Sequence, residues 1–289
     1  MSYTIQEFTP TNPQFPESLS RVNPPVPKLF VLSNQWSELF SRPRVAIVGS
    51  RKVTPYGQQV THQFASALAQ QGIVVVSGLA IGVDACAHRA ALEAQGPTIA
   101  VMPADLTGIY PRSHHHLAQS IVQKGGALIS EYPHPTPPSK WNFIERNRIV
   151  AGVADLVLVT EATHKSGTMH TARFALEQGK DVFAIPGLIT HETSAGTNQL
   201  IKTGAGLASS VSDILLALGI TPKEQKQAIR VADPNQQILV NLFAAGEQDG
   251  AIVFEKSKLP ITAFNQALTM LEITGVLTAL GNNKWVIRH

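Results

Sequence analysis

The residues best suited to chemistry in this sequence stand in short groups directly after apolar runs. Gly49, Ser50 and Arg51 follow the run Val45 to Val48. Ligands of open parallel sheets bind outside the carboxyl ends of the strands, so a glycine, a hydroxyl and a permanent cation at this place favour phosphate binding. The stretch has neither Gly-x-Gly-x-x-Gly nor the lysine-containing loop of nucleotide hydrolases. We therefore predict an anion site, with an ordinary surface ion pair as the alternative for Arg51.

A second group lies in the stretch Lys140 to Gly152. On a helix at about 100° per residue, one arc of about 120° collects Lys140, Phe143, Arg146 and Asn147, and Arg148 falls nearly opposite. An aromatic ring flanked by cations and an amide suits base stacking and phosphate binding in single-stranded nucleic acid. The alternative places Phe143 in the core and leaves the arginines solvated.

A third group surrounds the start of a helix predicted from Met169. Ser166, Gly167 and Thr168 precede this helix, and Thr171 lies one turn inside it. Hydroxyls and the free amides of a helix N-terminus favour an anion. Glu161 stands at the end of the preceding predicted strand, where we expect it to orient an arginine.

No group of ligands or nucleophiles predicts a metal, a cofactor or covalent catalysis. His114 to His116 are consecutive, so on a helix they spread over about 200° and cannot share one metal. Cys86 is the single cysteine, which fits a reducing compartment. The net charge is only +3, so an acidic partner must be met by a local patch. Without an apolar segment of about 18 residues, we expect a cytoplasmic protein that does not span a membrane.

Short apolar runs alternate with alanine-rich helical patterns over residues 44–218, and this alternation predicts the scaffold. The predicted strands are Val45–Val48, Val74–Val76, Ile99–Met102, Ala127–Ile129, Leu156–Val159 and Val182–Ile185. Repeated strand–helix alternation implies right-handed crossovers. The expected fold class is α/β, a Rossmann-like, mostly parallel sheet with helices on both faces.

Further segments flank this domain on each side. Residues 1–43 are rich in proline and aperiodic, and we expect an N-terminal arm lying over the domain. Residues 219–232 are predicted to form a linker. Residues 233–289 predict a helix over Asn235–Ala245, a short middle segment, a second helix and a hairpin, as in a winged helix. Its second helix, Ile261 to Thr274, has no lysine or arginine, and five acids oppose four bases over 233–289. We therefore expect this segment to serve protein contacts or stability rather than DNA affinity.

Several of these motifs, in the same order, resemble the DNA-processing protein A (DprA/Smf) family. The motifs are GSRKVTPYG, SGLAIGVDACAH, GGALISEYP, NFIERNRIVAG, SGTMHTARFALEQGKDVFAIPG and GTNQLIKTGA, together with the Tyr110-Pro111 step. The resemblance implies a non-enzymatic protein that binds single-stranded DNA, forms homodimers and loads the bacterial recombinase RecA onto incoming DNA in natural transformation. Ile81 stands where the family usually has a basic residue, which weakens one phosphate contact.

The resemblance also implies which residues form the DNA site. Carried onto matching positions, they are Gly49, Ser50, Arg51, Lys140, Phe143, Arg146, Ser166, Gly167, Thr168 and Thr171. Asn147 joins them from the helical arc. The matching dimer contacts are Ile201 and Leu207, with ordinary core as the alternative for this pair.

Two other classes of function stay open. Nucleotide phosphoribohydrolases of the lysine-decarboxylase-like group share glycine-rich strand ends, but their motif Pro-Gly-Gly-x-Gly-Thr-x-x-Glu carries a catalytic glutamate. The corresponding stretch here begins at His164, and Thr171 stands near the place of that glutamate. A transcription factor acting through the winged helix rests on the C-terminal segment alone. A titration with oligo-dT beside a nucleotide-hydrolysis assay separates these classes.

Overall fold

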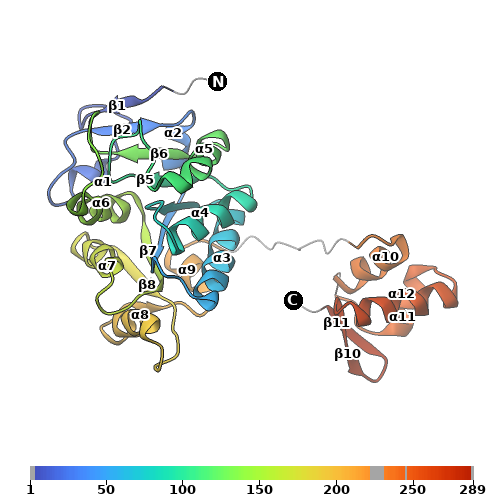
Figure 1. Cartoon of the computed structure of the whole chain (residues 1–289). Coiled ribbons are helices and arrows are strands. Elements are labelled where there is room, and N and C mark those ends of the chain that lie inside the picture. Colours follow the sequence, from blue (N-terminus) through green and yellow to red (C-terminus); the bar gives the residue numbers. More distant parts are fainter. Residues whose placement is uncertain (1–3, 222–230, 245, 288–289) are drawn as a thin grey trace. The chain divides into compact units, whose positions relative to one another are not determined.

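A nine-stranded sheet with the order β1-β2-β6-β5-β4-β3-β7-β8-β9 organises the first part of the chain (Figure 1). The computed structural model describes residues 4–221, 231–244 and 246–287. Seven strands run parallel: β3 (Arg44–Gly49), β4 (Val74–Ser77), β5 (Thr98–Val101), β6 (Ala127–Ser130), β7 (Leu156–Glu161), β8 (Asp181–Ala184) and β9 (Gly206–Leu207). All six strands predicted from apolar runs are present, so the expected parallel sheet is confirmed.

Helices cover both faces of this sheet, as the fold class requires. The helices of this region are α3 (Pro55–Gln70), α4 (Val83–Glu93), α5 (His115–Gln123), α6 (Lys140–Val153), α7 (Thr168–Glu177), α8 (Glu192–Lys202) and α9 (Val211–Ala217), with a 3-10 turn at Arg112–His114. Side chains alternate along a strand. In β3, Val45 and Ile47 therefore pack with the core under α3 and α4, whereas Ala46 and Val48 pack with the core under α6 and α7.

The helical pattern in the sequence begins near Gln58, whereas the helix after β3 begins three residues earlier, at Pro55, for a reason visible in the sequence. Thr54 is the N-cap, and its Oγ1 accepts a hydrogen bond from the Gly57 amide at 3.1 Å. Pro55 is the first helical residue, a position where its missing amide costs nothing. The helix ends before Gly72, whose φ of +85° favours glycine.

The N-terminal segment is an integral part of the first compact unit, Met1–Pro222, rather than an arm lying over it. It contributes β1 (Gln6–Phe8), α1 (Glu17–Ser20), β2 (Leu29–Leu32) and α2 (Trp36–Phe40). Strand β2 pairs antiparallel with β6, and β1 pairs antiparallel with β2. Phe8 and Trp36 are buried and stacked with ring centroids 6.2 Å apart. Scattered apolar residues therefore anchor this segment without any periodic pattern.

The second unit, Lys223–His289, has three helices and a two-stranded antiparallel hairpin among its described residues. Its elements are α10 (Pro234–Ala244), α11 (Gly250–Ser257), α12 (Ile261–Ile273), β10 (Leu277–Gly281) and β11 (Lys284–Ile287). Helix α11 was expected only as a short middle segment. Asp249 starts it by accepting hydrogen bonds from the amides of Ala251 and Ile252. Residues 222–230 of the expected linker lie outside the described residues. In the described ranges, no helix combines the length and apolarity needed to cross a membrane.

Candidate functional site

The carboxyl end of β3 meets the N-terminus of α7, which joins two of the three predicted groups. The Thr168 hydroxyl donates a hydrogen bond to the Gly49 carbonyl at 2.9 Å, and the Ser50 amide donates to the Glu161 carbonyl at 2.8 Å. A Cβ atom at position 49 would lie 2.6 Å from Val83 Cγ2, so only glycine allows this close approach. Gly49, Ser50 and Thr168 therefore build the floor of the strand-end site.

Glu161 fixes the loop after Arg51 and does not orient an arginine, so that expectation was wrong. Its carboxylate accepts hydrogen bonds from the amide of Thr54 at 2.9 Å and from the Thr54 hydroxyl at 2.8 Å. The side chain is buried, so these two bonds compensate the lost hydration of its charge. The glutamate thereby sets where the loop, and with it Arg51, leaves β3.

Arg51 and two aromatic residues form an exposed group beside this floor. The guanidinium carbon of Arg51 lies 5.0 Å from the centroid of the Phe143 ring. The Tyr110 ring meets Phe143 edge-on, with centroids 5.4 Å apart and planes at 67°. Lys140 is the first residue of α6 and is exposed, and Tyr110 is 44% exposed. Tyr110 was not among the predicted site residues, and the Tyr110-Pro111 step was the signal that pointed to it.

Arg146 shares a helical arc with Phe143 but points into the protein, since it is only 3% exposed. It donates hydrogen bonds to the carbonyl of Gly78 at 2.5 Å and to that of Val101. Burial lowers the pKa of Arg146 to about 10, and the nearby Asp84 opposes that shift. A Cβ atom at position 78 would lie 2.5 Å from the guanidinium, so glycine makes room for it. Arg146 therefore supports the site from inside the protein and does not reach its surface.

Arg148, on the other side of α6, is also buried. It forms two hydrogen bonds with the Glu131 carboxylate, at 2.9 and 2.6 Å. Phe143 is only half-buried. The alternative with Phe143 in the core and both arginines in solvent is therefore wrong, because each guanidinium finds acceptors inside the fold.

The residues at the start of α7 divide into an exposed and a buried set. Gly167 is exposed and Ser166 half-buried, and the Asn147 side chain donates to the Gly167 carbonyl at 3.4 Å. Thr168 is buried and Thr171 is 2% exposed. Ser166, Gly167 and Asn147 therefore reach the surface beside Phe143, whereas the two threonines support them from below.

The glycine-rich loop after β4 lines the opposite side of the site. Asp84 accepts hydrogen bonds from the amides of Gly78 at 3.1 Å and Ala80 at 3.4 Å, while Gly82 takes the N-cap position of α4. Burial raises the pKa of Asp84, and Arg146 opposes that shift. The place of Asp84 at the start of a helical pattern predicts an N-cap, but Asp84 holds the loop instead, and Gly82 is the N-cap. Ile81 is exposed at the tip of this loop.

The two predicted dimer residues lie at the far edge of the sheet. Leu207 belongs to the edge strand β9 and is 48% exposed, whereas Ile201 on α8 is partly buried against the core. The reading of both as ordinary core is therefore wrong for Leu207. An exposed leucine on an edge strand, which is paired on one side only, is suited to contact another chain.

Comparison with known proteins places this chain in one family. The family model of DNA recombination-mediator protein A matches residues 6–219. The chain is 39% identical to the Smf protein of Escherichia coli over 253 residues, which cover 82% of this chain and 66% of that protein. It is 40% identical to the DNA processing protein DprA of Bacillus subtilis over 202 residues, 70% of this chain and 67% of that protein.

Solved structures agree with these sequence matches. The DprA structure from Streptococcus pneumoniae superposes with a TM-score of 0.69 and 37% identity, covering 74% of each chain. The Helicobacter pylori structure, described as showing a single-stranded DNA binding mode, gives a TM-score of 0.66 and 36% identity over 74% of this chain and 95% of that one. The matched regions span two thirds or less of the Escherichia coli and Synechocystis relatives. The chain belongs to the DNA recombination-mediator protein A family, the DprA/Smf proteins.

Proposed function

We propose that this protein binds single-stranded DNA without enzymatic turnover at the carboxyl ends of β3 and β7. The observation that carries this proposal is the exposed guanidinium of Arg51 over the Phe143 ring, at 5.0 Å. A cation on an aromatic face offers a phosphate contact and a stacking surface in one place, which is what a single strand needs. The Helicobacter pylori relative is described as binding single-stranded DNA, which supports the same ligand here.

The predicted residues take two different roles in this proposal. Those that reach the surface contact the strand: Arg51, Lys140, Phe143, Asn147, Ser166 and Gly167, with Tyr110 added from the structure. Those that are buried, or whose polar groups are already bonded, position the first set: Gly49, Ser50, Arg146, Thr168 and Thr171. The exposed set supplies two cations and two aromatic rings, so binding is expected to be insensitive to base sequence and sensitive to salt.

The finer roles of the protein are part of the same proposal. We expect a homodimer formed through the β9 edge, which hands the bound strand to the recombinase RecA during natural transformation. The description of the family as recombination mediators supports this role. Co-precipitation of the host recombinase by the DNA-loaded protein, compared with Leu207→Lys, tests the partner and its dependence on the dimer.

A nucleotide hydrolase is the weaker alternative on this geometry. Three buried carboxylates follow the parallel strands, those of Glu161, Asp84 and Asp105, and each already accepts hydrogen bonds from backbone amides. At the place of the hydrolase glutamate stands Thr171, which is buried. Release of ribose phosphate from nucleoside monophosphates by the purified protein would favour the alternative.

The direct test is a titration of the full chain with fluorescent oligo-dT. Arg51→Glu is expected to remove most binding, because it loses a phosphate contact and adds repulsion. Phe143→Ala is expected to cost about 1–3 kcal/mol through lost stacking, with the salt dependence unchanged. Arg42→Glu is the matched control, since this exposed arginine precedes β3 at the opposite end of the strand. Equal binding by Arg51→Glu and Arg42→Glu would refute the site.

A further inference from the structure

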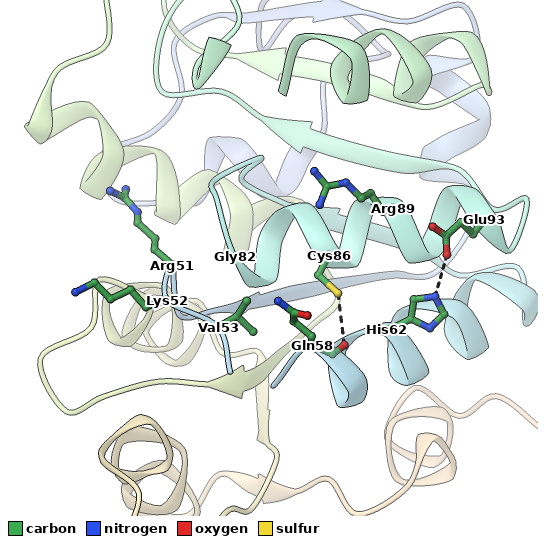
Figure 2. Close-up of a pocket in the computed structure, with 9 residues that line it drawn as sticks. All are labelled: Arg51, Lys52, Val53, Gln58, His62, Gly82, Cys86, Arg89 and Glu93. Atoms are coloured by element: carbon green, nitrogen blue, oxygen red, sulfur yellow. Dashed lines mark hydrogen bonds and ion pairs between the residues drawn. The ribbon is translucent and has the colours of Figure 1, made fainter. Parts of the chain in front are cut away.

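A second positively charged surface lies next to the strand-end site, in a pocket of about 390 Å³ between α3 and α4 (Figure 2). Gly82, Cys86, Arg89 and Glu93 line it from one stripe of α4, since they follow at three- and four-residue spacing. Gln58 and His62 face them from α3. Apart from Gly82, which is the N-cap of α4, none of these residues has a role in the site described above.

The charges in this pocket are strongly unbalanced. Arg51, Lys52 and Arg89 bring three permanent cations, against the single carboxylate of Glu93. That carboxylate is already engaged by His62 Nε2 at 2.9 Å. Within the described part of the chain, none of the three cations forms an ion pair. The pocket therefore has an excess of two positive charges, which makes it a local patch suited to an anion.

The pocket is continuous with the strand-end site through its loops. Arg51 belongs to both, because it lines the pocket while its guanidinium lies over Phe143. The backbone at Gly82 lies against the same loop, since an added Cβ would sit 2.3 Å from the Ser50 carbonyl oxygen. In Figure 2, Arg51 and Lys52 mark one end of the pocket and the His62–Glu93 pair marks the other. A strand leaving Phe143 past the end of the pocket marked by Arg51 and Lys52 therefore meets Arg89 on α4.

We propose that the pocket between α3 and α4 is a second phosphate subsite, which continues the path of a DNA strand from Phe143 past Arg51 and Lys52 to Arg89. This inference rests on the single-strand binding proposed above. No phenylalanine, tyrosine or tryptophan lines the pocket, and the His62 ring is held by Glu93 at 2.9 Å. The pocket therefore binds the sugar–phosphate backbone, without base stacking. Because stacking contributes about 1–3 kcal/mol per base, a short oligonucleotide occupies the Phe143 site first and only a longer one fills the pocket.

Arg89→Glu tests this order of filling, since Arg89 is exposed and its replacement leaves the core intact. With oligo-dT of about 6 nucleotides, the variant is expected to bind as the parent does. With about 30 nucleotides, it is expected to bind about tenfold more weakly. The slope of log affinity against log salt concentration is expected to fall in magnitude by about 0.7, for the lost phosphate contact. Arg42→Glu makes the same change in net charge away from both sites and serves as the control.

Cys86 offers a second readout, because it is the only cysteine of the chain and lines the pocket. Its thiol is half-exposed, and burial raises its pKa, so iodoacetamide labelling is done at alkaline pH. Saturating long oligo-dT is expected to slow labelling, whereas the short oligonucleotide leaves the rate unchanged. The slowing should be lost in Arg89→Glu.

The outcomes separate this inference from the proposed function. If Arg51→Glu abolishes binding while Arg89→Glu matches Arg42→Glu at both lengths, the second subsite is refuted and the strand-end site stands. Unchanged Cys86 labelling under saturating long oligo-dT refutes the subsite as well. If the parent protein binds neither oligonucleotide, the proposed function itself fails.

Discussion

Replacement of Arg146 by alanine separates a structural role from a DNA contact, because this arginine shares the helical arc of Phe143 but is buried. The change removes the two hydrogen bonds to the carbonyls of Gly78 and Val101. Each buried carbonyl left without a donor costs about 1–3 kcal/mol, and removing one member of a buried charged group typically costs about 3–5 kcal/mol in all. We therefore expect Arg146→Ala to lower the free energy of unfolding by about 3–5 kcal/mol.

The expected change in melting temperature follows from this loss of stability and from the size of the first unit. For about 150–250 residues, 1 kcal/mol corresponds to about 2–4 °C, so the melting temperature is expected to fall by about 6–20 °C. Circular dichroism during heating measures this shift. Arg51→Ala is the comparison variant: its exposed side chain is expected to change stability by about 0.5 kcal/mol or less, while DNA affinity falls.

The reverse pattern would refute the reasoning. If Arg146→Ala melts with the parent and loses oligo-dT affinity as Arg51→Ala does, Arg146 contacts the strand directly. Measurements of affinity well below the melting temperature keep unfolded protein from mimicking a loss of binding.

Three further predictions concern assembly, pH and the second unit. Leu207→Lys places a charge on the exposed β9 edge and is expected to give a folded monomer by light scattering, whereas Ile273→Lys, at an exposed position of the second unit, leaves the dimer intact. Burial lowers the pKa of His88 to about 3, so only the unfolded chain takes up this proton below about pH 6.5. The free energy of unfolding is therefore expected to fall between pH 6.5 and pH 5, by up to about 1.4 kcal/mol per pH unit. Urea denaturation at several pH values should show a smaller dependence on pH for His88→Gln. Truncation after Thr221 is expected to keep single-strand affinity within about tenfold in fluorescence titrations, because residues 233–289 carry more acids than bases.

The sheet was predictable because its signal is local. A parallel strand buried on both faces is a continuous apolar run, and Val45 to Val48 or Leu156 to Val159 show such runs without reference to the rest of the chain. The strand-end position of Gly49 to Arg51 follows from the same runs. Strand β2 also showed this signal in the apolar run Leu29 to Leu32. Strand β1 lacked it, because it has three residues and only Phe8 is buried.

The division of the site into contacts and supports depended on partners far away in the chain. The spacing of Phe143 and Arg146 defines a shared arc of α6, but an angle about a helix axis does not say which direction faces the sheet. The carbonyls that bind Arg146 belong to Gly78 and Val101, 68 and 45 residues earlier. In the same way, Glu161 was predicted to orient an arginine, and only the packing of β7 beside β3 placed it on Thr54. The sequence alone thus determined the strands and the residue types at their ends, whereas burial and hydrogen-bond partners, which arise only when distant segments pack together, decided what each residue does.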